Sequence, residues 1–225
     1  MNTGSFPIAW WKLLSLILLF YTFYAGFKGP VPELPILHET IRNLYFHVTM
    51  WMAMIVLMLS NAIYGIRYLS KQRMELDLAA DECARMAIVF GIAGLLTGMI
   101  WANYTWGAPW VNDPQLNGTA ATLLIYTAYF ILRNAIPDEQ KKARLSAVYG
   151  IFAFVMMFVF IMIIPKMTDS LHPGKGGNPG FNKYDLDSNM RMVFYPAVIG
   201  WTLLGVWMVN LRIRLRKIEW QRNSN

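Results

Sequence analysis

Cysteine is almost absent from this sequence. Cys83 is the single cysteine in 225 residues, so the chain cannot form an internal disulfide. The same scarcity excludes the CxxC pair of zinc sites and thiol-redox proteins, and the CxxCH signature of covalent haem attachment.

Charged residues are also scarce, and this scarcity indicates a membrane protein. They make up 15% of the chain, whereas soluble domains contain about 25%. Hydrophobic residues make up 56% and are gathered into long blocks, as in proteins that cross a membrane several times. The net charge of +7 does not indicate a nucleic-acid partner, because the basic residues stand at the ends of these blocks.

Six apolar blocks are long enough, or nearly so, to cross about 30 Å of hydrocarbon, which takes about 20 residues. They lack the alternation of strands, and backbone groups in lipid must pair within their own segment. We predict an all-α fold with six transmembrane helices in a single integral membrane domain, residues 1–225. The blocks are approximately 10–27, 43–66, 86–105, 119–133 (the shortest), 145–164 and 192–211.

The distribution of Lys and Arg predicts the orientation. With a cytoplasmic N-terminus, most of the 20 basic residues fall on the inner side, in agreement with the positive-inside rule. Both termini are then cytoplasmic, and the first block is a retained helix rather than a cleaved signal peptide. Outer loops result at 28–42, 106–118 and 165–190. The basic tail 212–223 is expected to anchor to anionic membrane lipid or to dock a partner.

Histidine is rare, and in this topology its three copies all fall on the outer side. His38 lies in the first outer loop, His47 begins the second helix, and His172 lies in the third outer loop. Two imidazoles can bind the two faces of a haem iron. For any one histidine, however, an interfacial position without a metal is the more frequent case. His47 stands on a rigid helix end, whereas the Pro- and Gly-rich segment after His172 suits a loop that closes over a bound object.

Tryptophans gather in the second outer loop, WGAPWVNDPQLNG, residues 106–118. Trp106 and Trp110 are four residues apart, and in a local helix their indoles share one face. Gly107 permits a close approach, and Pro109 stiffens the segment. The pair is equally consistent with a flat platform for a ligand and with the tryptophan belt of any membrane interface.

The same loop carries a resemblance to a known family. WGAPWVNDPQL resembles the tryptophan-rich WWD region of haem-handling membrane proteins, whose pattern is approximately W-G-x-x-W-x-W-D-x-R-L. IRNLYFHV (41–48) resembles the family segment R-x-x-Y-x-H-V, and DSLHPG (169–174) resembles the segment with the second family histidine. The matching positions are Trp106, Gly107, Trp110, Asp113 and Leu116 in the loop, with His47 and His172 as the histidines.

With its length and six expected helices, the chain looks most like the CcmC branch of this family, which serves the system I pathway of cytochrome c maturation. CcmF and CcsA proteins are generally longer. The resemblance covers roughly residues 40–210 and implies that haem b is held non-covalently and transiently at the outer face, with two axial histidines as metal ligands. The haem-binding residues that it implies are His47, His172, Trp106, Gly107, Trp110 and Asp113.

The resemblance also implies partners and a location. Haem passes to the periplasmic haem chaperone CcmE, and CcmD and the CcmA–CcmB ABC transporter are further partners in the bacterial inner membrane. The chain has no GxxxxGK[ST] phosphate loop, in agreement with a protein that is neither an ATPase nor another enzyme.

Two positions depart from the family pattern. Asn112 stands where the family has a third tryptophan, and Gln115 stands where it has an arginine suited to a haem propionate. Basic residues elsewhere on the outer side are the alternative propionate partners, namely Arg42, Lys166, Lys175, Lys183 and Arg191. Asp113 is expected to orient the loop by accepting N–H bonds, with a helix cap as the simpler alternative.

Other functions remain open at this point. A cytochrome b-like electron-transfer subunit needs haem ligands within the bilayer, where this topology places no histidine. A haem transporter permease needs polar residues in mid-membrane, for which Asn61 is the main candidate. An interhelical hydrogen bond is the more usual role of such an asparagine. A membrane scaffold without a ligand is a fourth reading, and His38, which has no motif, is treated as an ordinary loop residue.

Overall fold

The computed structural model describes residues 9–172 and 186–223, and the regular elements in these ranges are all helices, with no strand among them. This confirms the all-α prediction. The long helices are α1 (Trp10–Lys28), α2 (His47–Lys71), α3 (Met74–Trp106), α4 (Pro114–Ala135), α5 (Glu139–Phe158) and α7 (Ser188–Asn223). The shorter elements are the 3-10 helix η1 (His38–Tyr45), the π-helix η2 (Val159–Ile163) and α6 (Ile164–Met167).

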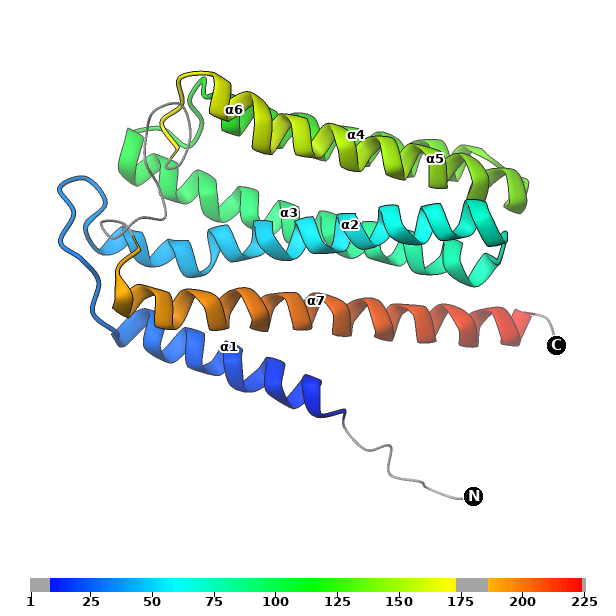
Figure 1. The fold of residues 1–225 in the computed structure, drawn as a ribbon, viewed down its shortest axis with the longest axis horizontal. Helices are drawn as coiled ribbons and strands as arrows, with labels where there is room; N and C mark the ends of the chain where they lie inside the picture. Colours follow the sequence, from blue (N-terminus) through cyan, green and yellow to red (C-terminus); the bar gives the residue numbers. More distant parts are fainter. Residues whose placement is uncertain (1–8, 173–185, 224–225) are drawn as a thin grey trace.

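Figure 1 shows an elongated bundle of helices that lie side by side. α4 and α5 form one side, α2 and α3 the middle, and α7 and α1 the other side. α2 is central because it contacts α3, α5 and α7. The start of α2, the end of α3 and α6 lie at one end, called the loop end below. The connection between α2 and α3 lies at the opposite end with the C-terminus, and this is called the tail end.

Five helical segments of the described chain are long and apolar enough to cross a membrane. They are Trp10–Lys28, His38–Lys71, Met74–Trp106, Glu139–Met167 and Ser188–Arg222. α4 covers the predicted block 119–133 but is not one of them, because Asn, Gln, Thr and Arg side chains dilute its apolar residues. Since α4 has 22 residues and lies alongside α5 (Figure 1), six crossings remain a prediction, as does the cytoplasmic position of both termini.

The start of α3 differs from the prediction. α3 begins at Met74 rather than at 86, so that Asp77, Asp81 and Glu82 are buried inside a helix. Arg133 of α4 explains much of this, because its Nη1 and Nη2 donate to the two carboxylate oxygens of Asp77 at 2.8 and 2.6 Å. Its Nε also lies 3.2 Å from Asp81. Charge pairing therefore joins α3 to α4 at the tail end.

Asn61 has the structural role expected of it. Its Nδ2 donates to the carbonyl oxygen of Ala80 at 2.9 Å, which links α2 to α3. On the other side, a Cβ at Gly150 of α5 would lie 2.6 Å from Oδ1 of Asn61. The interhelical hydrogen bond is confirmed, and the close fit of α5 against it leaves Asn61 2% exposed.

Candidate functional site

Asp113 connects the loop after α3 to the segment Ser170–His172. It is the N-cap of α4, and its Oδ1 accepts the backbone N–H of Gln115 at 2.8 Å. Its Oδ2 accepts the hydroxyl of Ser170 at 2.9 Å and the backbone N–H of Leu171 at 2.8 Å. Nδ1 of His172 lies 2.9 Å from Oδ1. Asp113 is 2% exposed, so one buried carboxylate both caps a helix and orients the loop, the two roles that the sequence left open.

The partners of Asp113 keep it ionised. Burial by itself raises the pKa of a carboxylic acid, because it disfavours the charged form. Hydrogen bonds from His172, Leu171 and Ser170 outweigh burial and hold the pKa of Asp113 well below its usual range. At neutral pH the carboxylate is therefore a fixed acceptor and not an acid.

His172 lies between Asp113 and the indole of Trp106. Its ring centroid is 4.9 Å from that of Trp106, with the planes at 70°. Because a carboxylate can only accept a hydrogen bond, Nδ1 of His172 carries a proton, and in the neutral ring Nε2 keeps its lone pair. The side chain is 21% exposed, so the ring is open on one side. The segment expected to move over a ligand, with Pro173 and Gly174, lies outside the described residues.

The local helix that would place the indoles of Trp106 and Trp110 on one face does not form. α3 ends at Trp106, and Gly107 forms its C-cap with a left-handed φ of 79°. Residues 107–113 are not helical, so a spacing of four no longer aligns the indoles. A Cβ at Gly107 would have no described atom within 4 Å. The glycine is needed here for its backbone conformation, and Trp110 remains at the surface, 38% exposed.

His47 begins α2, as predicted, and packs against α3. Its Nδ1 lies 2.8 Å from the carbonyl oxygen of Gly94. A Cβ at Gly98 would lie 2.5 Å from Cε1 of His47, so only glycine leaves room for the ring in this position. Trp51 and Trp101 meet the imidazole edge-on, with centroids at 6.3 and 5.9 Å. Since a carbonyl oxygen can only accept, Nδ1 of His47 also carries the proton and Nε2 keeps the lone pair.

The last turns of α3 organise both histidines. Gly98 and Trp101 border His47, and Trp106 contacts His172. Their segments lie together at the loop end in Figure 1. Within residues 9–172 and 186–223, no three His, Cys, Asp or Glu side chains form a metal cluster.

The basic residues expected to meet haem propionates are partly engaged elsewhere. Arg42 donates through Nη1 to two carbonyl oxygens at the C-terminal end of α1, at 2.9 and 2.6 Å, and so serves as a cap of that helix. Arg191 donates its Nε to the carbonyl oxygen of Leu186 at 2.9 Å. Lys166 is exposed and has no ion-pair partner in the described part of the chain. Lys175 and Lys183 lie outside the described residues.

Of the residues that hold the histidines, the sequence analysis named Asp113 but missed Gly94, Thr97, Gly98 and Ser170. Gly94 and Gly98 form a small-xxx-small pair, a known signal for close helix approach, and this signal was present in the sequence. Thr97 adds a contact of 3.5 Å to Nδ1 of His47. The contribution of Ser170 has no comparable signal, because a loop serine is common and its partner Asp113 is 57 residues away.

The chain matches the CcmC family, described as heme exporter protein C, over residues 2–225. The chain belongs to the CcmC family. It is 24% identical over 207 residues to heme exporter protein C of Escherichia coli (strain K12), covering 92% of this chain and 82% of that protein. It is 26% identical over 183 residues to heme exporter protein C of Rhodobacter capsulatus, covering 78% and 72%. Over 104 residues it is 25% identical to cytochrome c biogenesis protein CcsA of Prochlorococcus marinus (strain NATL1A), covering 46% and 32%.

The two departures from the WWD pattern have different surroundings in this CcmC-family chain. Asn112 is exposed, and its Oδ1 accepts Nδ2 of Asn117 at 2.8 Å. Gln115 has a buried Oε1 without a hydrogen-bond partner in the described ranges. Neither position provides a cation, so this loop contributes shape and acceptors but no positive charge.

Proposed function

We propose that this CcmC-family protein binds haem b non-covalently at the outer face of the bacterial inner membrane and delivers it to the periplasmic haem chaperone CcmE during c-type cytochrome biogenesis. The names of its relatives, which concern haem export and cytochrome c biogenesis, support the general role. The chain carries no GxxxxGK[ST] phosphate loop, in line with a protein that handles haem without itself hydrolysing ATP. CcmD and the CcmA–CcmB transporter are the partners proposed beside CcmE.

The observation that carries the proposal is the hydrogen bond between Asp113 and His172. Metal-binding histidines usually donate their second ring N–H to a carboxylate or a carbonyl, which fixes the tautomer and makes the free nitrogen a better ligand. His172 meets a buried carboxylate in this way. His47 meets the carbonyl oxygen of Gly94 at 2.8 Å. Both rings therefore offer Nε2, and we propose them as the axial ligands of the haem iron.

Apolar surface at the loop end fits the remainder of a porphyrin. Trp106 contacts His172 edge-on, and Trp110 is partly exposed beside the Asp113 cap. Indoles contribute large apolar areas and favour ring contacts. We propose that Trp106, Gly107 and Trp110 support the macrocycle while Asp113 holds His172. Haem supplies the iron and the apolar ring, and the chain supplies two fixed imidazoles and a surface.

Release requires one of the two ligands to leave the iron. His47 is wedged between α2 and α3 by Gly98 and two indoles. His172 is instead held by side-chain and backbone hydrogen bonds in the non-helical segment that follows α6. Because loop contacts open at lower cost than packed helices, we propose that His172 dissociates first when haem passes to CcmE.

The test is an optical titration of the purified protein with haem. His47→Ala and His172→Ala should each remove the absorption bands of iron with two imidazole ligands and prevent transfer of haem to purified CcmE. His38→Asn is the matched control, because it removes the third histidine of the loop end and Asn tolerates the positive φ of 43° found there. An unchanged spectrum and full transfer in both alanine variants would falsify the ligand assignment.

A further inference from the structure

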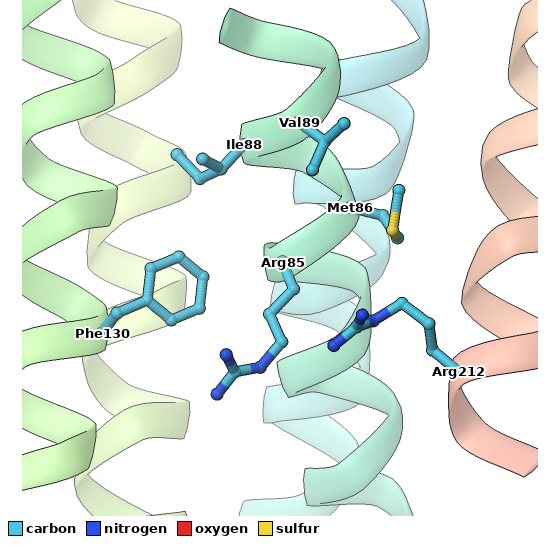
Figure 2. A pocket seen from close by; sticks show the side chains of 6 residues that line it. All are labelled: Arg85, Met86, Ile88, Val89, Phe130 and Arg212. Carbon is cyan, nitrogen blue, oxygen red and sulfur yellow. The ribbon is translucent and has the colours of Figure 1, made fainter. Parts of the chain in front are cut away.

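A groove lies at the tail end, far along α3 from the histidines. It has a volume of about 250 Å³ and is lined by Arg85, Met86, Ile88, Val89, Phe130 and Arg212. Figure 2 shows Arg85 of α3 between Phe130 of α4 and Arg212 of α7, with Ile88 and Val89 further along α3. The groove therefore has a cationic end and an apolar end.

The two arginines of the groove are each held by a single nitrogen. Nε of Arg85 donates to Oδ2 of Asp81 at 3.0 Å, and Nε of Arg212 donates to Oε2 of Glu82. Both acceptor carboxylates are buried, whereas the arginine side chains are 32% and 43% exposed. Their terminal Nη groups have no hydrogen-bond partner among residues 9–172 and 186–223. Each buried carboxylate thus holds one guanidinium by its Nε, and the Nη donors are left available to a ligand.

Arg133 shows what a fully engaged arginine looks like in the same cluster. All three of its guanidinium nitrogens lie against Asp77 and Asp81, and its side chain is 6% exposed. The contrast indicates that Arg85 and Arg212 do more than neutralise their neighbours. Planar guanidinium forks match the oxygens of phosphate and carboxylate groups in pairs.

The charge of the whole cluster is positive. Its three buried acids are Asp77, Asp81 and Glu82, and the arginines within 4.0 Å of them are Arg85, Arg133, Arg212 and Arg216. The cations exceed the carboxylates, so an anion placed at the outer Nη groups meets a net attraction. The guanidinium of Arg85 also lies 5.2 Å from the ring of Phe130, which holds it at the groove wall.

The apolar part of the groove lies toward the middle of the bundle. Val89 and Ile88 follow Arg85 by about one helical turn in the direction of the loop end, and Val89 is 52% exposed. When the phosphate of a phospholipid headgroup lies at the arginines, the acyl chain of that lipid lies along exposed apolar side chains. The volume is below the about 300–1,000 Å³ of pockets that enclose a whole small molecule, which favours one end of a lipid over an entire porphyrin.

We propose that Arg85 and Arg212 bind the phosphate of an anionic phospholipid in the membrane leaflet at the tail end, with an acyl chain against Val89. This site differs from a diffuse attraction between the basic tail and the membrane, because it needs two oriented guanidiniums and an adjoining apolar wall. A phosphate bound by both arginines links α3 to α7 at the protein surface. The ion pair of Arg212 with the buried Glu82 links the same two helices at the same level.

The experiment measures lipid retained by the full-length protein. The purified protein is exposed to equal amounts of phosphatidylglycerol and phosphatidylcholine with the same acyl chains, and bound lipids are counted by native mass spectrometry. Wild type should retain phosphatidylglycerol selectively. Arg85→Gln with Arg212→Gln should reduce that retention about tenfold or more, since two charge-assisted fork contacts are lost. Arg214→Gln with Lys217→Gln removes the same charge from α7 outside the groove and should leave retention unchanged.

Three outcomes would overturn the proposal. Equal losses in the two double variants would indicate diffuse attraction to the basic tail. Equal retention of both lipids by wild type would remove the role of the negative charge. Displacement of the lipid by millimolar inorganic phosphate or by haem would make the groove a site for those anions instead.

A further variant guards against misfolding when arginines are removed. Val89→Trp fills the apolar part of the groove and leaves every ion pair intact. It should lower phosphatidylglycerol retention severalfold while the protein still elutes as a single species in gel filtration. Retention equal to wild type in this folded variant would also overturn the proposal.

Discussion

Oδ1 of Asp113 and Nδ1 of His172 lie 2.9 Å apart, although 59 residues separate them in the chain. The same carboxylate caps α4 through the N–H groups of Gln115 and Leu116. The start of a helix and the orientation of a histidine therefore depend on a single side chain. A change at Asp113 is expected to affect the imidazole, the loop and the pH response together.

Asp113→Asn should weaken haem binding about 10–100-fold, the usual effect of losing the carboxylate behind a metal-binding histidine. Asparagine keeps one acceptor oxygen for the helix cap but loses the negative charge that orients Nδ1. Haem affinity is measured by absorbance titration. Asp187→Asn is the matched control, because Asp187 is also a helix-start aspartate, accepting the N–H of Met190 at 2.8 Å, and should leave affinity unchanged. Wild-type haem affinity in Asp113→Asn would show that Asp113 does not contribute to haem binding.

The depressed pKa of Asp113 predicts a specific pH dependence of stability. A carboxylate whose folded pKa lies below its unfolded value of about 4 contributes stability above that pH, and loses the contribution as pH falls through the folded pKa. The melting-temperature difference between wild type and Asp113→Asn should therefore narrow as the pH falls below about pH 4. A difference that grows with acidity would contradict the hydrogen-bond network around Asp113.

Gly98→Ala should disturb His47 without breaking α3. The new Cβ would lie 2.5 Å from Cε1 of the ring, so the imidazole must turn away from the carbonyl oxygen of Gly94. Haem affinity should fall at least tenfold, with the helix content unchanged by circular dichroism. Leu96→Ala, at a 56% exposed position of the same helix, is the control and should bind haem as wild type does. Normal binding by Gly98→Ala would show that the fixed ring position is dispensable.

Gly107→Ala should lower stability by about 1 kcal/mol, the cost of placing a side chain in the left-handed region. The cost comes from the φ of 79° alone, because no described atom lies within 4 Å of the added Cβ. Gly107→Asn should cost less, since asparagine adopts this region more readily. Unfolding in mixed detergent micelles with increasing dodecyl sulfate measures both. Equal losses in the two variants would argue for a steric cause instead.

Arg133→Gln should be strongly destabilising, by about 3–5 kcal/mol, because it leaves the buried Asp77 carboxylate without its cation. Arg73→Gln is the matched control, since it breaks an ion pair with Glu75 in which both side chains are more than half exposed. That pair is expected to contribute less than about 1 kcal/mol. The same micelle unfolding assay compares them. Similar losses in the two variants would contradict the burial of the Arg133 pair.

Local sequence patterns predicted those helix starts that depend on nearby residues alone. The apolar run after Ala9 and the one after Phe46 give helices that start at Trp10 and His47, close to the predicted blocks. The start of α3 was missed because Asp77 and its neighbours have the composition of a connector. Their burial depends on Arg133, which is 56 residues further along the chain, and no local pattern contains that information.

The candidate site also combines features that a local motif indicates with contacts that depend on distant residues. The family motif pointed to His47, Asp113 and His172 individually, and the assignment of these residues to haem remains a proposal. The contact between Asp113 and His172 is tertiary, so spacing did not predict it. The helical reading of Trp106–Trp110 failed for a local reason, because a glycine directly after a long helix commonly ends it in the left-handed conformation.

α4 has a consequence for how the chain is assembled. Too few of its side chains are apolar for it to leave water readily as a lone segment, yet one of its ends is fastened by Asp113 and the other by Arg133. Both fastenings need partners that belong to other parts of the chain, the segment around Ser170 and the first turns of α3. The first turns of α3 are made before α4, but Ser170 is made after it, so the Asp113 end of α4 gains its fastening only once the segment around Ser170 has been synthesised.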